Sequence, residues 1–489
     1  MIRLHKKLLA LLASVSALSL LGFIYTSVNY FRLGFPLDDA WIHQTYARNL
    51  ALSGEWAFQQ GIPSAGSTSP LWSGILSIGY LLGSGPYIWT YFLGWLFLFA
   101  ISSLGFIYVH KIYQIEANFA LMVGLFLAIE WHMVWAAVSG MEILLFTTII
   151  ISTFLLLGKT PSRWFIVGML IGLSIWCRPD GITLLGPAFL YPFLLPGNWR
   201  SRKYAIIKIG SGFLLLFLPY MAFNLDLSGS IWPNTLTAKQ AEYLVERNVP
   251  YILRLFRQSS LPIIGPGVLL LPGFILFIYN SIRFKRWNDL LGVTWLLGFI
   301  ALYAWKLPVT YQHGRYLIPI MPVFFIFSFV GIYSVLRVRS SIAWQRILQR
   351  VYVLSLGLVT ISFWFVGAKA YARDVSIIES EMVDIAHWIV ENTDQDSLIA
   401  AHDIGALGFF SERRLLDLAG LVSPEVIPFI RDEARLKQYL DKNKVDLLIT
   451  FPGWYPWLIK NGQLIYTTKG TFSPLLGGEN MAIYQWKPP

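Results

Sequence analysis

Long apolar runs separated by short polar segments occupy most of the first 370 positions of this chain. The first run covers residues 8–30 and is long enough to cross about 30 Å of hydrocarbon as one helix. A signal peptide would have a shorter apolar core and a small-residue cleavage site, so we expect this helix to be retained. Further apolar segments predict helices at roughly 70–83, 86–109, 117–130, 141–157, 164–178, 181–196, 204–223, 261–281, 289–305, 316–336 and 351–369.

The charged positions between these segments predict which loops are cytoplasmic. Lys and Arg collect on the cytoplasmic side of a membrane, and the clusters around Arg200 and Arg283 have this character. The N-terminus is then cytoplasmic, while the loops at 32–69, 224–260 and 306–315 and the chain after 370 lie outside. This topology needs an odd number of crossings, whereas the apolar segments number twelve, so we expect 11 or 13 transmembrane helices.

The chain changes character near residue 373. Residues 374–489 are mixed and polar, as in a soluble domain. Positions 379–391 and 436–442 have helical spacing, and 397–401 and 445–451 have the composition of short buried strands. We therefore predict a polytopic helical membrane module at 1–373, followed by a soluble extracytoplasmic α/β domain at 374–489.

Composition agrees with a membrane protein and excludes several other classes. Apolar residues make up 56% of the chain and charged residues only 13%, against about 25% charged residues in a typical soluble domain. The net charge of +11 is explained by cytoplasmic loops, so we expect no nucleic-acid partner. The single cysteine excludes an internal disulfide.

Two adjacent carboxylates, Asp38 and Asp39, lie at the start of the first outside loop. Neighbouring residues on a helix point about 100° apart, so one carboxylate can face a substrate while the other has a different role. Mutual repulsion and nearby lipid raise a carboxylate pKa, which suits a general base. The structural alternative is that Asp38 caps a helix starting at Asp39, whose dipole favours both charges.

Further ionisable and polar residues lie at the ends of apolar segments, where burial of charge is costly and points to function. Three of them, Arg178, Lys239 and Arg315, are the residue types that hold a phosphate oxyanion. In the alternative interpretation Arg178 pairs with a carboxylate such as Asp180, Lys239 is solvated and Arg315 extends to the membrane interface. The other polar candidates are Glu142, His313 and Tyr316.

Familiar cofactor and nucleotide motifs are absent from the sequence. No His and Cys spacing resembles a zinc site, and there is no P-loop, GxSxG or dinucleotide-binding motif. We therefore expect neither nucleotide hydrolysis nor a serine triad, and the sequence requires no cofactor. A divalent cation (Mg²⁺, Mn²⁺ or Ca²⁺) held by Asp38 and Asp39 stays an open alternative.

The motifs together resemble the GT-C superfamily of membrane glycosyltransferases over about residues 8–370, most closely the branch of the mycobacterial terminal arabinofuranosyltransferases. A similar outside domain follows the membrane module in that branch. Asp180 departs from the Arg-Pro-acid motif of this superfamily, in which the acidic residue is more often Glu. The motifs that carry the resemblance are Asp-Asp-Ala-Trp-Ile at 38–42, Ser-Thr-Ser-Pro-Leu-Trp at 67–72, Ser-Gly-Met-Glu at 139–142, Arg-Pro-Asp at 178–180, Pro-Asn-Thr-Leu-Thr-Ala-Lys at 233–239 and Gly-Arg-Tyr-Leu-Ile-Pro at 314–319.

The resemblance implies an inverting enzyme that moves a sugar from a polyprenyl monophosphate to a glycan, lipid or protein acceptor at the outer face of the cytoplasmic membrane. It implies an aspartate of the first loop as the base. Asp38 is our first choice, with Asp39 orienting the acceptor or contacting a metal. The remaining implied roles are donor-phosphate binding by Arg178, Lys239 and Arg315, and substrate orientation by Glu142, His313 and Tyr316.

Two other classes of function remain open. A transporter or flippase for a lipid-linked sugar would be equally hydrophobic, although transporters often carry internal repeats and none is visible here. A catalytically silent membrane scaffold is the other alternative. Because a scaffold has no need of the carboxylate pair or the three cations, their presence favours glycosyl transfer.

Overall fold

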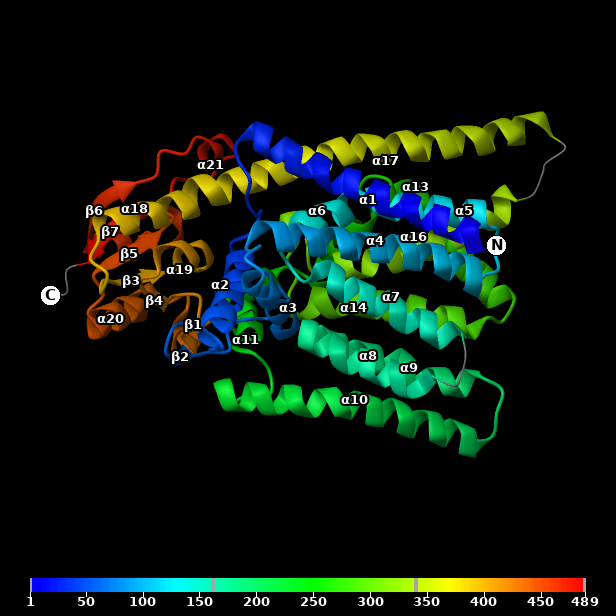
Figure 1. Ribbon diagram of the computed structural model, residues 1–489, viewed down its shortest axis with the longest axis horizontal. Coiled ribbons are helices and arrows are strands. Elements are labelled where there is room, and N and C mark those ends of the chain that lie inside the picture. Colours follow the sequence, from blue (N-terminus) through cyan, green and yellow to red (C-terminus); the bar gives the residue numbers. More distant parts are fainter. Residues whose placement is uncertain (1, 160–162, 338–341, 487–489) are drawn as a thin grey trace.

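The computed structural model describes residues 2–159, 163–337 and 342–486, and in it the protein has two parts. A bundle of helices forms one end of the molecule and a small α/β domain forms the other (Figure 1). The N-terminus lies at the end of the bundle that is far from the domain. The predicted helical module and the predicted C-terminal α/β domain are thus both present. The last three residues of the predicted domain lie outside the described range.

The bundle combines long apolar helices with shorter connecting ones. Its apolar helices are α1 (Ile2–Tyr30), α3 (Pro70–Leu81), α4 (Tyr87–Ile112), α5 (Ala117–Ile129), α7 (Ile143–Lys159), α8 (Trp164–Cys177), α9 (Leu185–Leu194), α10 (Trp199–Ser228), α13 (Gly267–Arg283), α14 (Trp287–Lys306), α16 (Met321–Leu336) and α17 (Ala343–Ile377). The connecting elements are α2 (Asp38–Ser53), β1 (Ala57–Gln59), β2 (Ile62–Pro63), α6 (Trp131–Val138), α11 (Asn234–Glu242), α12 (Tyr251–Ser260) and the turn α15 (Tyr311–Gly314).

Long apolar helices account for part of the predicted membrane crossings. Within the described chain, six helices are long and apolar enough to cross a membrane, or eight if each of two bent helix pairs is one span. Two shorter apolar helices, Ile143–Gly158 and Trp164–Cys177, lie in the bundle as well, so the expected 11 or 13 spans stay a prediction. The prediction counted α3, with 12 residues, and α9, with 10, as spans. At 1.5 Å per residue they reach only about 18 Å and 15 Å, well short of the hydrocarbon thickness.

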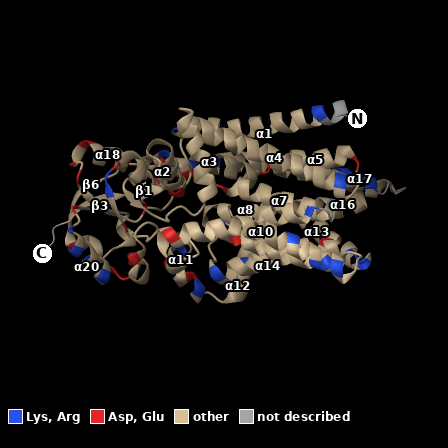
Figure 2. Ribbon diagram, turned by 60° about the horizontal axis from the view of Figure 1, so that its bottom comes forward, with Lys and Arg blue, Asp and Glu red and all other residues tan. Residues whose placement is uncertain are grey.

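Basic residues gather at the end of the bundle that lies away from the α/β domain (Figure 2). The loops predicted to be cytoplasmic also include the basic segment 337–350, of which Arg339 lies outside the described residues. The described basic residues of the predicted cytoplasmic loops include Arg163, Arg200, Arg202, Lys203, Arg283, Lys285, Arg286, Arg337, Arg346 and Arg350.

A single long helical segment joins the two parts of the protein. Helix α17 continues through a π-helical turn, Ile378–Val383, into α18 (Asp384–Asn392). Along the bundle, α17 lies beside α1. The predicted boundary between residues 373 and 374 therefore falls inside a continuous helix, so no flexible linker separates the domain from the membrane module.

The domain is built on a five-stranded mixed sheet with strand order β4-β3-β5-β7-β6. Strand β3 pairs in parallel with both β4 and β5, and β7 pairs antiparallel with both β5 and β6. Alternate residues of β3 point to opposite faces: Ile399 packs in the core that continues into the bundle, whereas Ala400 packs in a separate core with α20. The elements are β3 (Leu398–Ala401), α19 (Gly405–Ser411), β4 (Arg414–Asp417), α20 (Glu433–Asn443), β5 (Leu447–Thr450), β6 (Gly462–Thr467), α21 (Phe472–Leu475) and β7 (Ala482–Trp486).

Several elements of the domain were predictable from local pattern. The expected strands at 397–401 and 445–451 correspond to β3 and β5, and the expected helix at 436–442 lies within α20. The strands β4, β6 and β7 were not predicted. Each of them includes charged or polar residues, and their pairing is decided by neighbours that are distant along the chain.

The first outside loop holds the domain through helix α2. Asp38 does not cap its own helix, because no side-chain bond caps α2, so the capping alternative is wrong. Its two carboxylate oxygens instead accept hydrogen bonds from the backbone N–H groups of Gly405 and Ala406, at 2.7 Å each. These N–H groups start α19 and have no intrahelical partner. Asp38 therefore caps a helix of the other domain.

The opposite end of α19 is held by the same helix, α2. Arg48 donates to the carbonyl of Phe409 at 2.8 Å and pairs with Glu412 at 3.0 Å. Between the two ends, the ring of Trp41 packs on Phe409 and Phe410, with centroids 4.9 Å and 4.6 Å apart. Acid at the helix N-terminus and base at its C-terminus both match the helix dipole. Thus α2 fixes α19 in position and direction.

Replacing Gly405 with alanine should loosen the attachment of the domain. A Cβ at this position would lie 2.0 Å from the backbone oxygen of Asp38, so α2 and α19 must separate, at a cost of about 1–3 kcal/mol. We expect G405A to show a lower Tm and faster release of the C-terminal domain in limited proteolysis. The matched control is G357A in α17, where a Cβ meets nothing within 4 Å. Wild-type protease resistance in G405A would contradict this packing argument.

Candidate active site

Two cavities meet beside the N-terminal end of α2. The larger one, here called the interface cavity, has a volume of about 850 Å³ and lies between α2, α11 and the loops of the C-terminal domain. The smaller one, here called the apolar cavity, has a volume of about 240 Å³ and is lined mainly by side chains such as Ile143, Trp232 and Leu302. Lys239 and Arg315 line both cavities. Any reaction between the contents of the two cavities would therefore take place beside these two cations.

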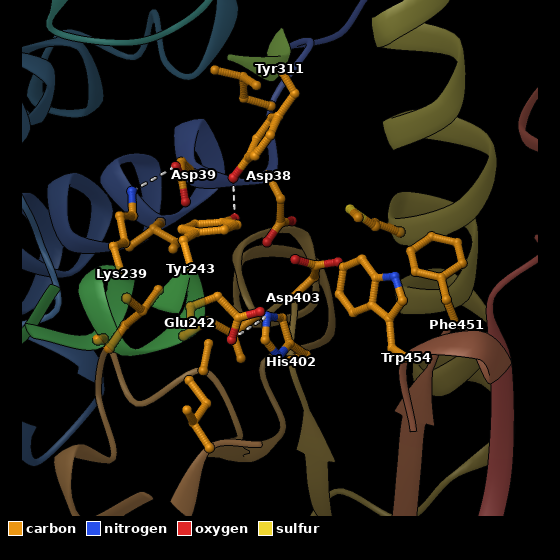
Figure 3. A pocket seen from close by; sticks show the side chains of 18 of the residues that line it. Asp38, Asp39, Lys239, Glu242, Tyr243, Tyr311, His402, Asp403, Phe451 and Trp454 are labelled. Carbon is orange, nitrogen blue, oxygen red and sulfur yellow. Dashed lines mark hydrogen bonds and ion pairs between the residues drawn. The ribbon is translucent and has the colours of Figure 1, made fainter. Parts of the chain in front are cut away.

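Asp39 joins the two cations in a partly buried ion-pair triad. Its Oδ2 atom lies 3.1 Å from Lys239 Nζ and 2.7 Å from Arg315 Nη2, and Figure 3 shows the contact with Lys239 at the wall of the interface cavity. Burial alone would raise the pKa of Asp39, but the two cations hold it well below its usual range. Burial would likewise lower the pKa of Lys239, and the charge of Asp39 raises it instead.

The triad has a surplus of positive charge and of hydrogen-bond donors. Two cations face one carboxylate, which leaves one net positive charge. The Nε and Nη1 atoms of Arg315 are buried and have no hydrogen-bond partner among the described residues, an arrangement that is costly in a folded protein. The planar guanidinium group matches phosphate or carboxylate oxygens. The site is therefore suited to an anion.

The two cavities differ in charge. The apolar cavity is lined by four basic side chains, Arg178, Lys239, Lys306 and Arg315, and by two acidic ones, Glu142 and Asp180. The interface cavity is lined by five acidic side chains, Asp38, Asp39, Glu242, Asp403 and Glu433, and by three basic ones, Lys239, Arg315 and Arg431. An anionic group with an apolar tail fits the first cavity. The second disfavours anions and suits hydroxyl groups.

The neighbouring aspartates have separate roles. Burial raises the pKa of Asp38 to about 6, against the effect of its hydrogen bonds from Ala406 and Gly405. Both of its oxygens are occupied by those bonds, which hold the domain in place. The geometry therefore does not favour Asp38 as the first choice of base. Asp39 is the carboxylate that lines the interface cavity and pairs with the two cations that line both cavities.

Arg178 has the paired environment that the structural alternative predicted. Its guanidinium group contacts Asp180 at 3.2 Å, Glu142 at 3.2 Å and the hydroxyl of Tyr303 at 2.8 Å. It lines the apolar cavity as well, so its predicted role in phosphate binding stays a prediction. Lys239 and Arg315 depart from their alternatives, because both pair with Asp39: the side chain of Arg315 is buried and that of Lys239 is partly buried.

The predicted orienting residues fall into two groups. Glu142 and Tyr316 line the apolar cavity, and the Tyr316 hydroxyl accepts a hydrogen bond from Arg315 at 3.0 Å. His313 lines neither cavity, which argues against direct contact with a substrate there. Its Nε2 atom lies 2.8 Å from Asp374 on α17, and its φ of 58° places it in a tight left-handed turn. His313 therefore positions the loop that carries Arg315.

Sequence reasoning missed His43, His402 and Asp403. His43 lies one helical turn after Asp39 and 3.6 Å from Glu142; burial lowers its pKa. His402 and Asp403 directly follow β3 and line the interface cavity. Their place after a predicted strand was the available signal, because ligands in α/β sheets often bind at the carboxyl ends of parallel strands.

The residues do not fit a divalent cation held by Asp38 and Asp39. In residues 2–159, 163–337 and 342–486, no group of three or more His, Cys, Asp or Glu side chains is placed to hold a metal ion. Asp38 is occupied by backbone N–H groups and Asp39 by two cations.

The fold matches solved structures of membrane glycosyltransferases. ArnT from Cupriavidus metallidurans, solved bound to undecaprenyl phosphate, aligns with a TM-score of 0.63 at 14% identity over 96% of this chain and 97% of that one. The oligosaccharyltransferase of Archaeoglobus fulgidus, solved with Zn and sulfate, aligns with a TM-score of 0.63 at 12% identity over 97% of this chain and 72% of that one. The chain therefore has the GT-C fold of a multi-pass membrane protein, as the motifs predicted.

Sequence comparisons add a match in the C-terminal part of the chain. A family described as a domain of unknown function, DUF8728, matches residues 370–484, and no curated protein matches the chain. The mycobacterial arabinofuranosyltransferase AftD aligns with a TM-score of 0.49 at 16% identity, over 97% of this chain and 41% of that one. That score carries no argument for one branch, so the likeness to the arabinofuranosyltransferase branch rests on the sequence motifs.

Removing the charge of Arg178 should destabilise the protein more than removing that of Arg315. R178M leaves two buried carboxylates without their shared cation, which typically costs about 3–5 kcal/mol. R315M leaves Asp39 paired with Lys239 and removes donors that have no partner. Thermal unfolding in detergent should give the larger fall in Tm for R178M. Equal losses in the two variants would contradict the different roles assigned to these arginines.

Proposed function

We propose that this protein is an inverting glycosyltransferase that moves a sugar from a polyprenyl monophosphate to an acceptor at the outer face of the cytoplasmic membrane. The observation that carries the proposal is the pair of cations, Lys239 and Arg315, shared by an apolar, electropositive cavity and an acidic one. A lipid-linked sugar phosphate has the matching parts: an apolar chain, one anionic phosphate and a sugar. No nucleotide is needed for its transfer.

The donor's phosphate is placed on Lys239 and Arg315, with the polyprenyl chain leaving through the apolar cavity. The unpartnered Nε and Nη1 atoms of Arg315 supply donors for phosphate oxygens. The structure of ArnT with undecaprenyl phosphate provides a precedent for this ligand class in the same fold. Arg178 supports this arrangement by holding Glu142 beside the cavity, and a substitution of Arg178 tests whether it is a further phosphate ligand.

The reaction is a single displacement at the anomeric carbon. An acceptor hydroxyl oxygen in the interface cavity attacks this carbon while the bond from the carbon to the phosphate oxygen breaks, and Asp39 takes the hydroxyl proton. The leaving polyprenyl phosphate gains one negative charge as the bond breaks. Lys239 and Arg315 are already in place to stabilise that charge, which is the form of catalysis with the largest typical effect. Attack opposite the leaving group inverts the configuration.

Donor binding would also prepare Asp39 as the base. In the free protein Asp39 is held as an ion pair by both cations, which makes it a weak base. When the phosphate engages Lys239 and Arg315, their effect on Asp39 falls and its pKa rises towards the range useful for proton transfer. The base would then be activated only when the donor is present.

The proposed orientation places the C-terminal domain and both cavities outside the cell. The basic end of the bundle lies away from the domain (Figure 2), and basic residues favour the cytoplasmic side. The N-terminus is then cytoplasmic, and the acceptor, whether glycan, lipid or protein, is met on the outer side. Nucleic acid has no part in this function.

The central test is sugar release from defined donors by protein reconstituted in lipid. We expect one polyprenyl-phosphate sugar from a panel to lose its sugar in the presence of acceptor, and D39N to lower kcat by about 10²–10⁴, as for loss of a general base. The matched control is D226N, an exposed aspartate near the end of α10, which should keep wild-type turnover.

Three other outcomes would contradict parts of the proposal. Wild-type turnover in D39N would remove Asp39 as the base. Vectorial movement of intact lipid without sugar release would favour the transporter alternative. Binding of the donor without release or movement, with every acceptor class tried, would favour the scaffold.

The activation of Asp39 by donor predicts a specific pH dependence. A base works when deprotonated, so activity falls as pH drops through its pKa. The pH profile of kcat/KM for the donor reports the pKa of Asp39 in the free enzyme, where it lies well below its usual range. The pH profile of kcat reports the pKa of Asp39 in the enzyme with bound donor. The acidic limb of kcat should therefore lie at higher pH than that of kcat/KM, in steady-state measurements over both profiles. Coincident limbs, or the reverse order, would contradict donor-dependent activation.

A further inference from the structure

The interface cavity opens at the switch point of the domain's sheet. Strand β3 is followed by the crossover through α19 to β4 on one side, while β5 lies on the other side and continues towards β6 and β7. Connections that leave neighbouring parallel strands in opposite directions create a crevice at their carboxyl ends, where open α/β sheets bind ligands. His402 and Asp403 follow β3, and Phe451 and Trp454 follow β5; all four line the cavity.

Asp403 is the polar group at the centre of this crevice. Figure 3 shows it between Asp38 and the ring of Trp454. Its Oδ2 atom is buried and has no hydrogen-bond partner among the described residues. Burial, together with the charges of Asp38 and Asp39, raises the pKa of Asp403 well above its usual value. A ligand hydroxyl that donates to this oxygen would satisfy the missing bond.

An aromatic surface lies beside this carboxylate. Trp454 is about half exposed. Its ring packs edge-to-face with the ring of His402, with ring centroids 4.9 Å apart. His402 is itself held by the hydroxyl of Tyr455, 2.7 Å from its Nδ1 atom. Across the cavity, Glu242 of α11 lies 4.0 Å from His402 Nε2, so the wall facing the domain is also acidic.

We infer that this crevice is the acceptor subsite and that the acceptor is an uncharged glycan. Trp454 packs on the apolar face of a sugar ring, and Asp403 and Glu242 accept hydrogen bonds from the hydroxyl groups of the glycan. This inference rests on the proposed transfer reaction for its meaning, because it names the acceptor class of that reaction. The excess of carboxylates in the cavity disfavours an anionic acceptor such as a phosphorylated lipid headgroup.

The test uses binding as well as turnover, so that the acceptor subsite and the transfer reaction can fail separately. Fluorescently end-labelled mannotriose, maltotriose and arabinotriose serve as neutral probes, with trigalacturonic acid as the anionic probe and an acidic peptide as the protein-type probe. We expect at least one neutral trisaccharide to bind the full-length protein in detergent and the anionic probe to bind more weakly. W454A and D403N should each weaken that binding by roughly tenfold, the effect of losing about 1.4 kcal/mol.

Two controls keep a local effect apart from misfolding. W457A removes an exposed tryptophan of the same loop that does not line the cavity, and D396N removes an exposed aspartate just before β3. Both should bind the neutral probe as the wild type does. In turnover, W454A should raise the acceptor KM about tenfold while changing the donor KM much less.

The outcomes separate the two proposals. Failure of every neutral trisaccharide to bind wild-type protein at millimolar concentration would overturn the acceptor subsite, as would stronger binding of trigalacturonic acid or of the peptide. Equal binding by W454A, D403N and wild type would overturn it as well. Neutral-glycan binding that depends on Trp454, without sugar release from any donor, would uphold the subsite and contradict the proposed transfer reaction.

Discussion

The organisation of the site depends on one partly buried carboxylate oxygen, Asp39 Oδ2, that is shared by Lys239 and Arg315. The three residues come from α2, α11 and the loop before α16, which are far apart in sequence. A buried charge is tolerated only when it is paired, so the ion pairs tie these three elements to one point. The same two cations line both cavities. Donor and acceptor would meet at this triad. In the free protein the negative charge of Asp39 holds the two cations in place, and the donor's phosphate would take over that role.

The neighbouring residue, Asp38, couples this point to the C-terminal domain. Adjacent positions on α2 direct one carboxylate to the triad and the other to the first N–H groups of α19. The continuous helix from Ala343 to Asn392 makes a second, rigid connection between the two parts. The domain therefore has two attachments, one at each side of the interface cavity. This placement explains how the carboxyl ends of β3 and β5 come to form one wall of a cavity whose opposite wall belongs to the membrane module.

Much of the fold could be predicted from the sequence because it follows from local pattern. Apolar runs predicted the helices of the bundle, and composition and spacing predicted two strands and two helices of the domain, at 379–391 and 436–442. The exact number of spans could not be predicted because apolarity does not reveal helix length: α3 and α9 are apolar but end after 12 and 10 residues. The continuity of α17 into the domain was missed because the change from apolar to polar surface at residue 373 does not interrupt the helix.

The site was partly predictable for a related reason. Residue type and position at segment ends singled out Asp39, Lys239 and Arg315, which the structure brings together. Residue type and position could not separate Arg178 from Arg315. Arg178 is engaged by Glu142, Asp180 and Tyr303, whereas two nitrogen atoms of Arg315 have no hydrogen-bond partner among the described residues. Residue type and position also could not assign the two aspartates, because the partner of Asp38 lies 367 positions away. Partners that distant are fixed by tertiary structure alone.

The most direct measurement is a structure of the protein in a lipid nanodisc with bound polyprenyl monophosphate, the product of the proposed reaction. The account predicts phosphate oxygens within hydrogen-bond distance of Lys239 and Arg315, the lipid chain in the apolar cavity, and the ion pairs of Asp39 lengthened or broken. A phosphate bound elsewhere, with the Asp39 triad unchanged, would contradict it.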